Sequence, residues 1–146
     1  MSGALPEQEV SPAELMLDVL ERKLHPNVAP GGIVVGPASD AQQQAGVVSI
    51  VDAGLPRLER YQSLVWDRAQ MRCIAPTLAS ADKIARGVQF ALHMQGRIIA
   101  RMESTGDKYL VHLVNIIAGP SMHFDSPETW ETLIFAEMLV GTEPVS

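Results

Sequence analysis

The stretch "LVWDRAQMRCIAPTLASADKIARGVQFALHMQG", residues 64–96, decides the fold class because it joins a strand pattern directly to a helix pattern. In residues 64–75 small or apolar side chains alternate with polar ones, which predicts a strand with one buried face and one wet face. Asp67 interrupts the apolar face, so we expect this end of the strand to project beyond the core. The apolar face is formed by Val65, Ala69, Met71, Cys73 and Ala75, and the polar face by Arg68, Gln70 and Arg72.

The rest of this stretch predicts a helix that lies on the sheet. Pro76 ends the strand, Thr77 or Ser80 can cap the helix, and Gly96 closes it after about Gln95. Apolar residues then recur at the three-to-four spacing of one helical stripe. The small residues among them let the helix approach a sheet closely. The stripe contains Ala81, Ile84, Ala85, Val88, Ala91 and Leu92, with Phe90 or Gln95 at its margin.

Upstream, the chain predicts one more helix and two strands. Ser11-Pro12-Ala13-Glu14 is a typical helix start, and an apolar stripe continues to about Leu24, before His25-Pro26 ends the helix. The β-branched runs 33–35 and 47–53 predict strands, and the polar stretch 37–46 between them predicts a loop. Residues 54–64 have no clean period, so we interpret them as an extended or mobile arm.

Downstream, the pattern predicts an antiparallel run of strands. We expect strands at 97–104 and 109–118, a hairpin connection at 105–108, and an exposed loop at 119–128. Residues 129–140 alternate with apolar side chains on both faces, so part of this last strand should be covered on both sides. The prediction is a single α+β domain over residues 1–146, with two helices packed on one face of a mainly antiparallel sheet of about six strands. Residues 1–10 form a flexible segment, 11–140 the core and 141–146 a tail.

Composition and charge narrow the function. The 146 residues are 47% hydrophobic and 19% charged, which fits one ordinary domain. A net charge of -6 argues against DNA binding as the main function, because phosphate neutralisation needs clustered Lys and Arg. The polar N-terminal segment is unlike a signal peptide, and no run approaches the roughly 18 apolar residues of a membrane span. We therefore expect a soluble protein made in the cytoplasm.

No motif predicts catalysis, a cofactor or a metal. The histidines His25, His93, His112 and His123 lie far apart in sequence, and there is no glycine-rich phosphate loop or GxSxG turn. Cys73, the only cysteine, lies mid-strand on the apolar face and is interpreted as a small buried hydrophobe. An enzyme site at His123, Asp125 and Glu128 is the least supported alternative. Long polar segments on a small sheet favour binding instead, and a small binding domain of a cellular protein remains open.

Four segments resemble the tail terminator (tail-completion, minor capsid) proteins of long-tailed bacteriophages. The first is the amphipathic helix from Pro12 to Leu24, and the second is "VVSIVDAGLPR", residues 47–57. The third is "DRAQMRCIAPTLASADKIARGVQFALHMQG", residues 67–96, and the last is "VNIIAGPSMHFDSPETWETLIFAEMLV", residues 114–140. Neck proteins of the same virions share similar small folds, so an adjacent head-tail connector is the alternative.

The resemblance implies a structural protein that forms a hexameric ring at the head-proximal end of the tail tube. Its partners would be other copies of itself, the tail tube protein and a neck or head-completion protein, with no membrane. It would be assembled in the host cytoplasm and reside in the virion. Phage DNA would pass through the lumen without sequence-specific binding, and the negative charge would suit such a channel unless Arg57, Arg60, Arg68 and Arg72 lined it. The candidate interface residues are Gln42, Gln43, Gln44, Arg57, Arg60, Tyr61, His123, Phe124 and Trp130, with Trp130 equally suited to the core.

Overall fold

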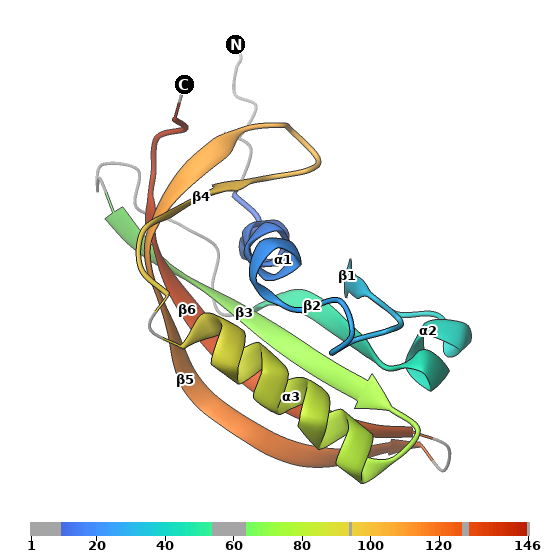
Figure 1. Cartoon of the computed structure of the whole chain (residues 1–146). Helices are drawn as coiled ribbons and strands as arrows, with labels where there is room; N and C mark the ends of the chain where they lie inside the picture. Colours follow the sequence, from blue (N-terminus) through green and yellow to red (C-terminus); the bar gives the residue numbers. More distant parts are fainter. Residues whose placement is uncertain (1–9, 54–63, 94, 127–128, 146) are drawn as a thin grey trace.

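A computed structural model of the chain describes residues 10–53, 64–93, 95–126 and 129–145. Its six strands form one sheet in the order β1-β2-β3-β6-β5-β4, in which only the β1–β2 pair is parallel (Figure 1). The α+β prediction is therefore confirmed. The elements are α1 (Pro12–Lys23), β1 (Ile33–Val35), α2 (Asp40–Ala45), β2 (Val47–Ala53), β3 (Leu64–Ala75), α3 (Leu78–Leu92), β4 (Ile98–Arg101), β5 (Lys108–Ser126) and β6 (Thr129–Gly141).

Helices α1 and α3 begin where the caps predicted. The Ser11 hydroxyl accepts a hydrogen bond from the amide of Glu14 at 3.4 Å, and the Thr77 hydroxyl accepts one from the amide of Ser80 at 3.1 Å. Helix α3 ends at Leu92, earlier than the predicted Gln95, because His93 already leaves the helical conformation as the C-cap. Local sequence thus determines where both helices begin.

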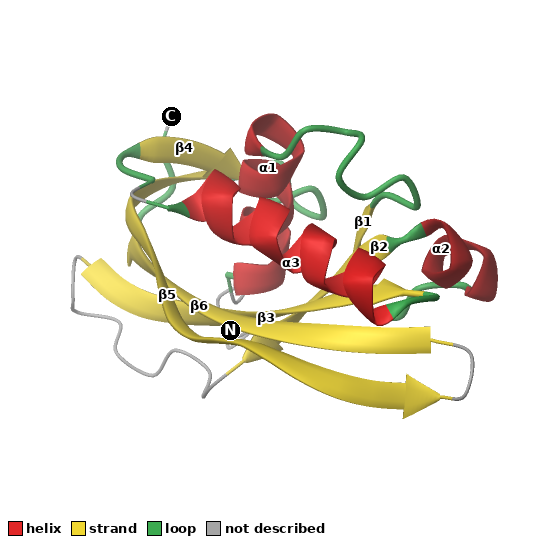
Figure 2. Ribbon diagram, turned by 60° about the horizontal axis from the view of Figure 1, so that its bottom comes forward, coloured by secondary structure: helices red, strands yellow, loops and turns green. Residues whose placement is uncertain are grey.

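Both long helices lie on the same face of a curved sheet (Figures 1 and 2). Their apolar stripes meet the inward faces of β2, β3, β5 and β6 and form one continuous core. This core excludes water from the fully buried side chains of Leu15, Met16, Leu20, Ile50, Met71, Leu92, Ile134 and Met138.

The expectation that Asp67 projects beyond the core is wrong, because this residue is only 6% exposed. Strand β3 pairs with β6 along its whole length, from Leu64 opposite Gly141 to Ala75 opposite Trp130. Its start is therefore paired with β6 and belongs to the sheet, although β2 pairs with β3 only from Arg68 onward.

Residues 37–46, predicted as a loop, contain a third helix, α2. The Ser39 and Gln42 side chains each bond the other's backbone in a capping box, at 3.2 and 2.9 Å. A helix of 6 residues is too short to show an apolar period, and none of its residues is buried. Sequence periodicity therefore could not predict α2.

Residues 119–126, predicted as a loop, continue strand β5, which pairs with β6 as far as Ser126 opposite Thr129. The Gly119-Pro120 break falls within a register shift between Ala118 and Ser121, so the ladder absorbs it as an irregularity. The end of the predicted tail is also paired, since the Val145 amide donates to the Lys108 carbonyl at 2.7 Å. The predicted arm at 54–63 lies outside the described residues.

Candidate interaction site

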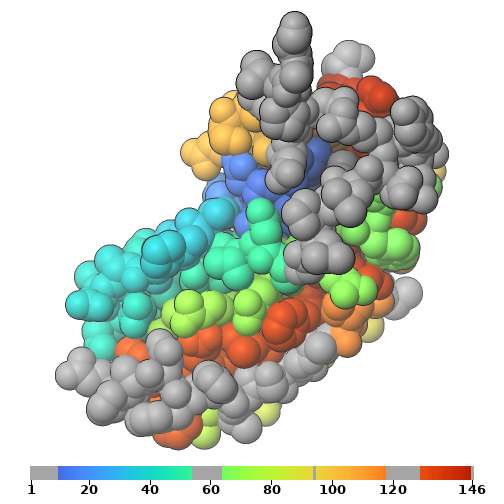
Figure 3. Space-filling view, turned by 180° about the vertical axis from the view of Figure 1, so that it is seen from behind, coloured from blue at the N-terminus to red at the C-terminus, as the bar shows by residue number. Residues whose placement is uncertain are grey.

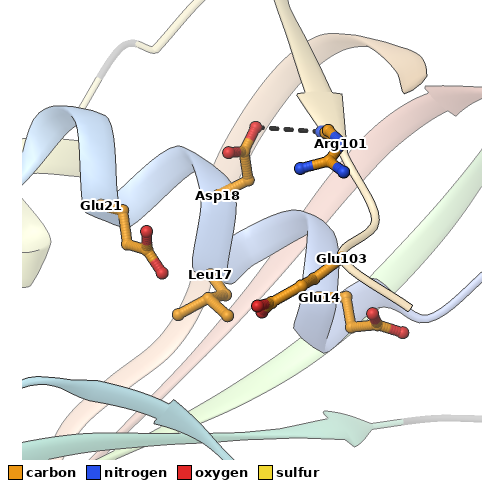
Figure 4. A pocket seen from close by; sticks show the side chains of 6 residues that line it. All are labelled: Glu14, Leu17, Asp18, Glu21, Arg101 and Glu103. Atoms are coloured by element: carbon orange, nitrogen blue, oxygen red, sulfur yellow. Dashed lines mark hydrogen bonds between the residues drawn. The ribbon is translucent and has the colours of Figure 1, made fainter. Parts of the chain in front are cut away.

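The outer edge of strand β4 is closed by side chains of helix α1. Asp18 accepts a hydrogen bond from the backbone amide of Arg101 at 2.9 Å, and Glu14 accepts one from the amide of Ser104 at 2.7 Å (Figure 4 shows the Asp18 contact). Arg22 donates to the carbonyl of Ile99. The Arg101 amide and the Ile99 carbonyl are backbone groups that an exposed β4 edge would offer to another strand, and Ser104 lies in the turn after β4. The β4 edge is therefore already satisfied within the subunit.

The opposite edge of the sheet, strand β1, has no such cover among the described residues. Strand β1 pairs on one side with β2, from Ile33 opposite Val48 to Val35 opposite Ile50, and is the last strand of the sheet. Its three side chains are half-buried or exposed. An open edge of this kind is a template for a partner chain.

A groove of about 530 Å³ lies between β1, α1 and the turn after β4. We call it the β1 groove. Its apolar part comes from Leu17 and the three aliphatic residues of β1, and its acidic part from three glutamates. Neither Lys nor Arg is found among the described residues that line it. The lining residues are Ser11, Glu14, Leu17, Glu21, Ile33, Val34, Val35, Glu103 and Ser104.

A smaller cavity of about 150 Å³ adjoins the groove on the α1 side (Figure 4). Its lining adds Asp18 and Arg101 to four residues shared with the groove. The Asp18 carboxylate is already engaged by the Arg22 guanidinium at 2.8 Å as well as by the Arg101 amide. In the part of the chain that the structure describes, no three His, Cys, Asp or Glu side chains are placed to hold a metal ion. The acidic side chains here therefore form a negatively charged surface.

The predicted burial of Cys73 is confirmed. Burial, with a smaller contribution from the Glu131 carboxylate, raises the pKa of its thiol to about 12. Because the thiolate is the nucleophile, Cys73 is inert at neutral pH. His25 has a local role, since its Nδ1 accepts a hydrogen bond from the amide of Asn27 at 3.1 Å.

The glutamines predicted as contacts partly serve local structure. Gln42 completes the capping box of α2, and the Gln43 amide donates to the carbonyl of Ala38 at 3.1 Å. Gln44 is exposed. These bonds tie the first two side chains to their own turn, so Gln44 is the one of the three with an exposed side chain for a partner.

Trp130 is half-buried and packs against the core. The backbone of β5 places His123 opposite Glu131 and Phe124 opposite Trp130. The side chains of His123 and Phe124, together with residues Arg57, Arg60 and Tyr61, lie outside what the structure describes. The structure therefore assigns Trp130 at least a share in the core.

On the face of the sheet opposite the two long helices, residues of β2, β3 and β6 lie in adjacent rows (Figure 3). Two arginines of β3 face glutamates of β6 there. Arg72 donates two hydrogen bonds of 2.7 Å to Glu131, while Arg68 lies 3.9 Å from Glu137. Two of the four arginines named in the lumen argument are thus paired with carboxylates, and the other two, Arg57 and Arg60, lie outside the described residues.

The outer face of α3 carries a feature that the sequence prediction placed wrongly. Phe90, predicted at the margin of the buried stripe, is 85% exposed. Lys83 and Arg86 precede it by seven and four residues, which puts all three side chains on one side of the helix. The same spacing is visible in the sequence and could have revealed this face. We call these three residues the α3 face.

No protein-family model matches the chain, and no curated protein is significantly similar to it in sequence. Of the helices that the structure describes, none has the length and apolar character needed to cross a membrane.

Proposed function

We propose that the protein is a structural, non-enzymatic virion protein: a tail terminator that forms a ring, caps the tail tube and joins it to the head or neck. The observation that supports this proposal is the difference between the two edges of the sheet. One edge is closed by α1 through Asp18 and Arg22, and the other opens onto the β1 groove. A subunit with one open edge is suited to directional assembly.

Ring assembly needs this kind of asymmetry. In a closed ring each subunit meets its neighbours through two different surfaces, and the rotation between copies returns to the start. Were both edges open, the sheets could instead join edge to edge without limit. Because the β4 edge is closed, strand β1, which borders the β1 groove, is the open edge among the described strands.

The resemblance in the four segments supports the specific role. In that role six copies form the ring, the tail tube protein and a neck or head-completion protein bind its two rims, and phage DNA passes through the lumen. The protein would assemble in the host cytoplasm and remain in the virion. An adjacent neck protein would use the same open edge, so the choice between the two positions depends on which partner binds.

Size-exclusion chromatography with light scattering tests the proposal, on the full chain alone and after mixing with the tail tube protein. The expected result is a particle of about six times the 15.8 kDa of one chain, or a stable complex with tubes. Electron microscopy of that fraction should show closed rings or capped tube ends. A monomer at every concentration that never joins a tube would rule the proposal out.

A further inference from the structure

The β1 groove has the properties of a receptor for a basic, partly apolar surface. Glu14, Glu21 and Glu103 provide three carboxylates, and Leu17 and β1 provide the apolar part. Its volume of about 530 Å³ falls within the roughly 300–1,000 Å³ of pockets that bind ligands. The chemistry of the occupant is therefore one apolar anchor flanked by positive charge.

A second copy cannot fill this groove by pairing its own β1 edge there. Such a contact would bring the three glutamates of one copy against the same three glutamates of the other, and like charges in close contact are costly. The pairing would also be two-fold, which closes a dimer instead of a ring. The occupant must come from another part of the subunit.

The α3 face fits this description. Phe90 is a large, exposed aromatic side chain, and Lys83 and Arg86 lie on the same side of the helix. Arg86 also pairs with Asp82 at 2.9 Å, but that pair is on the surface and leaves the Lys83 charge in excess. Aromatic and arginine side chains are enriched among residues that dominate interface energies.

One copy cannot insert its own α3 face into its own groove. The opposite side of α3 is held on the sheet by Ile84 and Val88, which are buried in the core. Helix α1 contributes Glu14, Leu17 and Glu21 to the lining of the groove, whereas no residue of α3 lines it. Any contact between these two surfaces therefore joins different copies.

We propose that the α3 face of one copy docks into the β1 groove of the next. Phe90 lies against Leu17 and the β1 side chains, while Lys83 and Arg86 face Glu21 and Glu103. This contact is heterologous, as a ring requires, and it uses a helix in a groove as its recognition mode. The inference rests on the proposed ring and names the surfaces that build it.

A charge exchange between Arg86 and Glu21 tests the contact, with light scattering over a concentration series under the conditions in which the wild type assembles, alone or with tube protein. Arg86→Glu and Glu21→Arg alone should each raise the concentration needed for half-assembly by about tenfold or more, and the double variant should recover most of that loss. Phe90→Ala should raise it by about thirtyfold. Both charge changes are at exposed positions, so melting temperatures should stay near that of the wild type.

Leu113→Ala provides the matched control, because Leu113 is also an exposed apolar residue but pairs with Leu139 on the opposite face of the sheet. It should assemble as the wild type does. If Phe90→Ala and the single charge changes also assemble normally, the proposed contact is wrong and the ring stands. If the wild type neither oligomerises nor joins tubes, the proposed function itself fails and the contact fails with it.

Discussion

The carboxylate of Asp18 accepts a hydrogen bond of 2.9 Å from the backbone amide of Arg101, and so attaches helix α1 to the outer edge of strand β4. The same carboxylate is paired with Arg22, which donates in turn to the Ile99 carbonyl. One side chain thus helps both to hold the helix and to occupy the edge of the sheet. The β1 edge has no equivalent among the described residues, and this contrast underlies the proposed assembly.

Asp18→Ala should destabilise the subunit and expose the β4 edge. Loss of a charged acceptor is expected to lower the free energy of unfolding by about 1.5–3 kcal/mol. The freed edge should also promote disordered self-association, visible as a rise in light scattering. Urea denaturation measures the first effect. Asp82→Ala is the control, since Asp82 also pairs with an arginine four residues on, Arg86, and should cost only about 0.5 kcal/mol.

Arg72→Met should destabilise the fold by about 2 kcal/mol. It leaves the Glu131 carboxylate, whose side chain is 4% exposed, without its 2.7 Å partner. The cost should lie below the roughly 3–5 kcal/mol of a fully buried pair, because the Arg72 side chain is 32% exposed. Arg68→Met is the matched change on the same two strands. There the atoms are 3.9 Å apart and Arg68 is 56% exposed, so the cost should stay below about 1 kcal/mol. If both variants lose the same free energy of unfolding in chemical denaturation, Arg72 and Glu131 do not form the stronger of the two ion pairs.

Thr132→Val should stabilise the protein. The Thr132 hydroxyl is fully buried in the core layer of β6 and has no hydrogen-bond partner among the described residues. Replacing it with a methyl group of similar shape removes an unsatisfied polar atom, which is worth about 1 kcal/mol. Thermal unfolding should show a higher melting temperature for Thr132→Val, while Thr132→Ala should lower it by leaving a cavity. A lower melting temperature for Thr132→Val would indicate a bonding partner.

Cys73 should resist thiol reagents in the folded protein and react fully in denaturant. Its pKa is raised from 9.0 to about 12, so the unfolded thiol ionises first as the pH rises. The stability linked to this group is therefore complete below pH 9.0 and is lost as the pH rises toward 12. Denaturation of wild type and Cys73→Ala across this window should show a steeper decline for the wild type. Parallel curves would show that the folded thiol ionises normally.

Much of the fold could be predicted because local signals were strong. The Ser11 and Thr77 caps located two helix starts, and the alternation in residues 64–75 predicted β3 with its observed bounds. The sequence signal failed where the shortness of a helix or the pairing of two strands determined the structure. Helix α2 is too short for a period, and pairing with β6 extends β5 through Gly119-Pro120.

The candidate site was harder to predict from the sequence than the fold was. The β1 groove is built from residues of α1, β1 and the turn after β4, which only the tertiary fold brings together. The burial of Asp67 was also not predictable from the sequence. A carboxylate is expected to be exposed unless the pairing of its strand is known. The sequence did predict which side of α3 faces the sheet, but it placed Phe90 at the margin of that buried side. The face formed by Lys83, Arg86 and Phe90 was therefore missed, although its spacing was visible.

Hydrogen-deuterium exchange on the assembled protein tests the central claim most directly. We predict that the amides of residues 33–35 and the segment 83–90 both become more protected on assembly, by comparison with the dissociated Phe90→Ala variant. The amides of β4, which pairs with β5 and whose Arg101 amide is already bonded to Asp18 of α1, should change little. Assembly without added protection at residues 33–35 would contradict the claim that the open edge of the sheet joins the subunits.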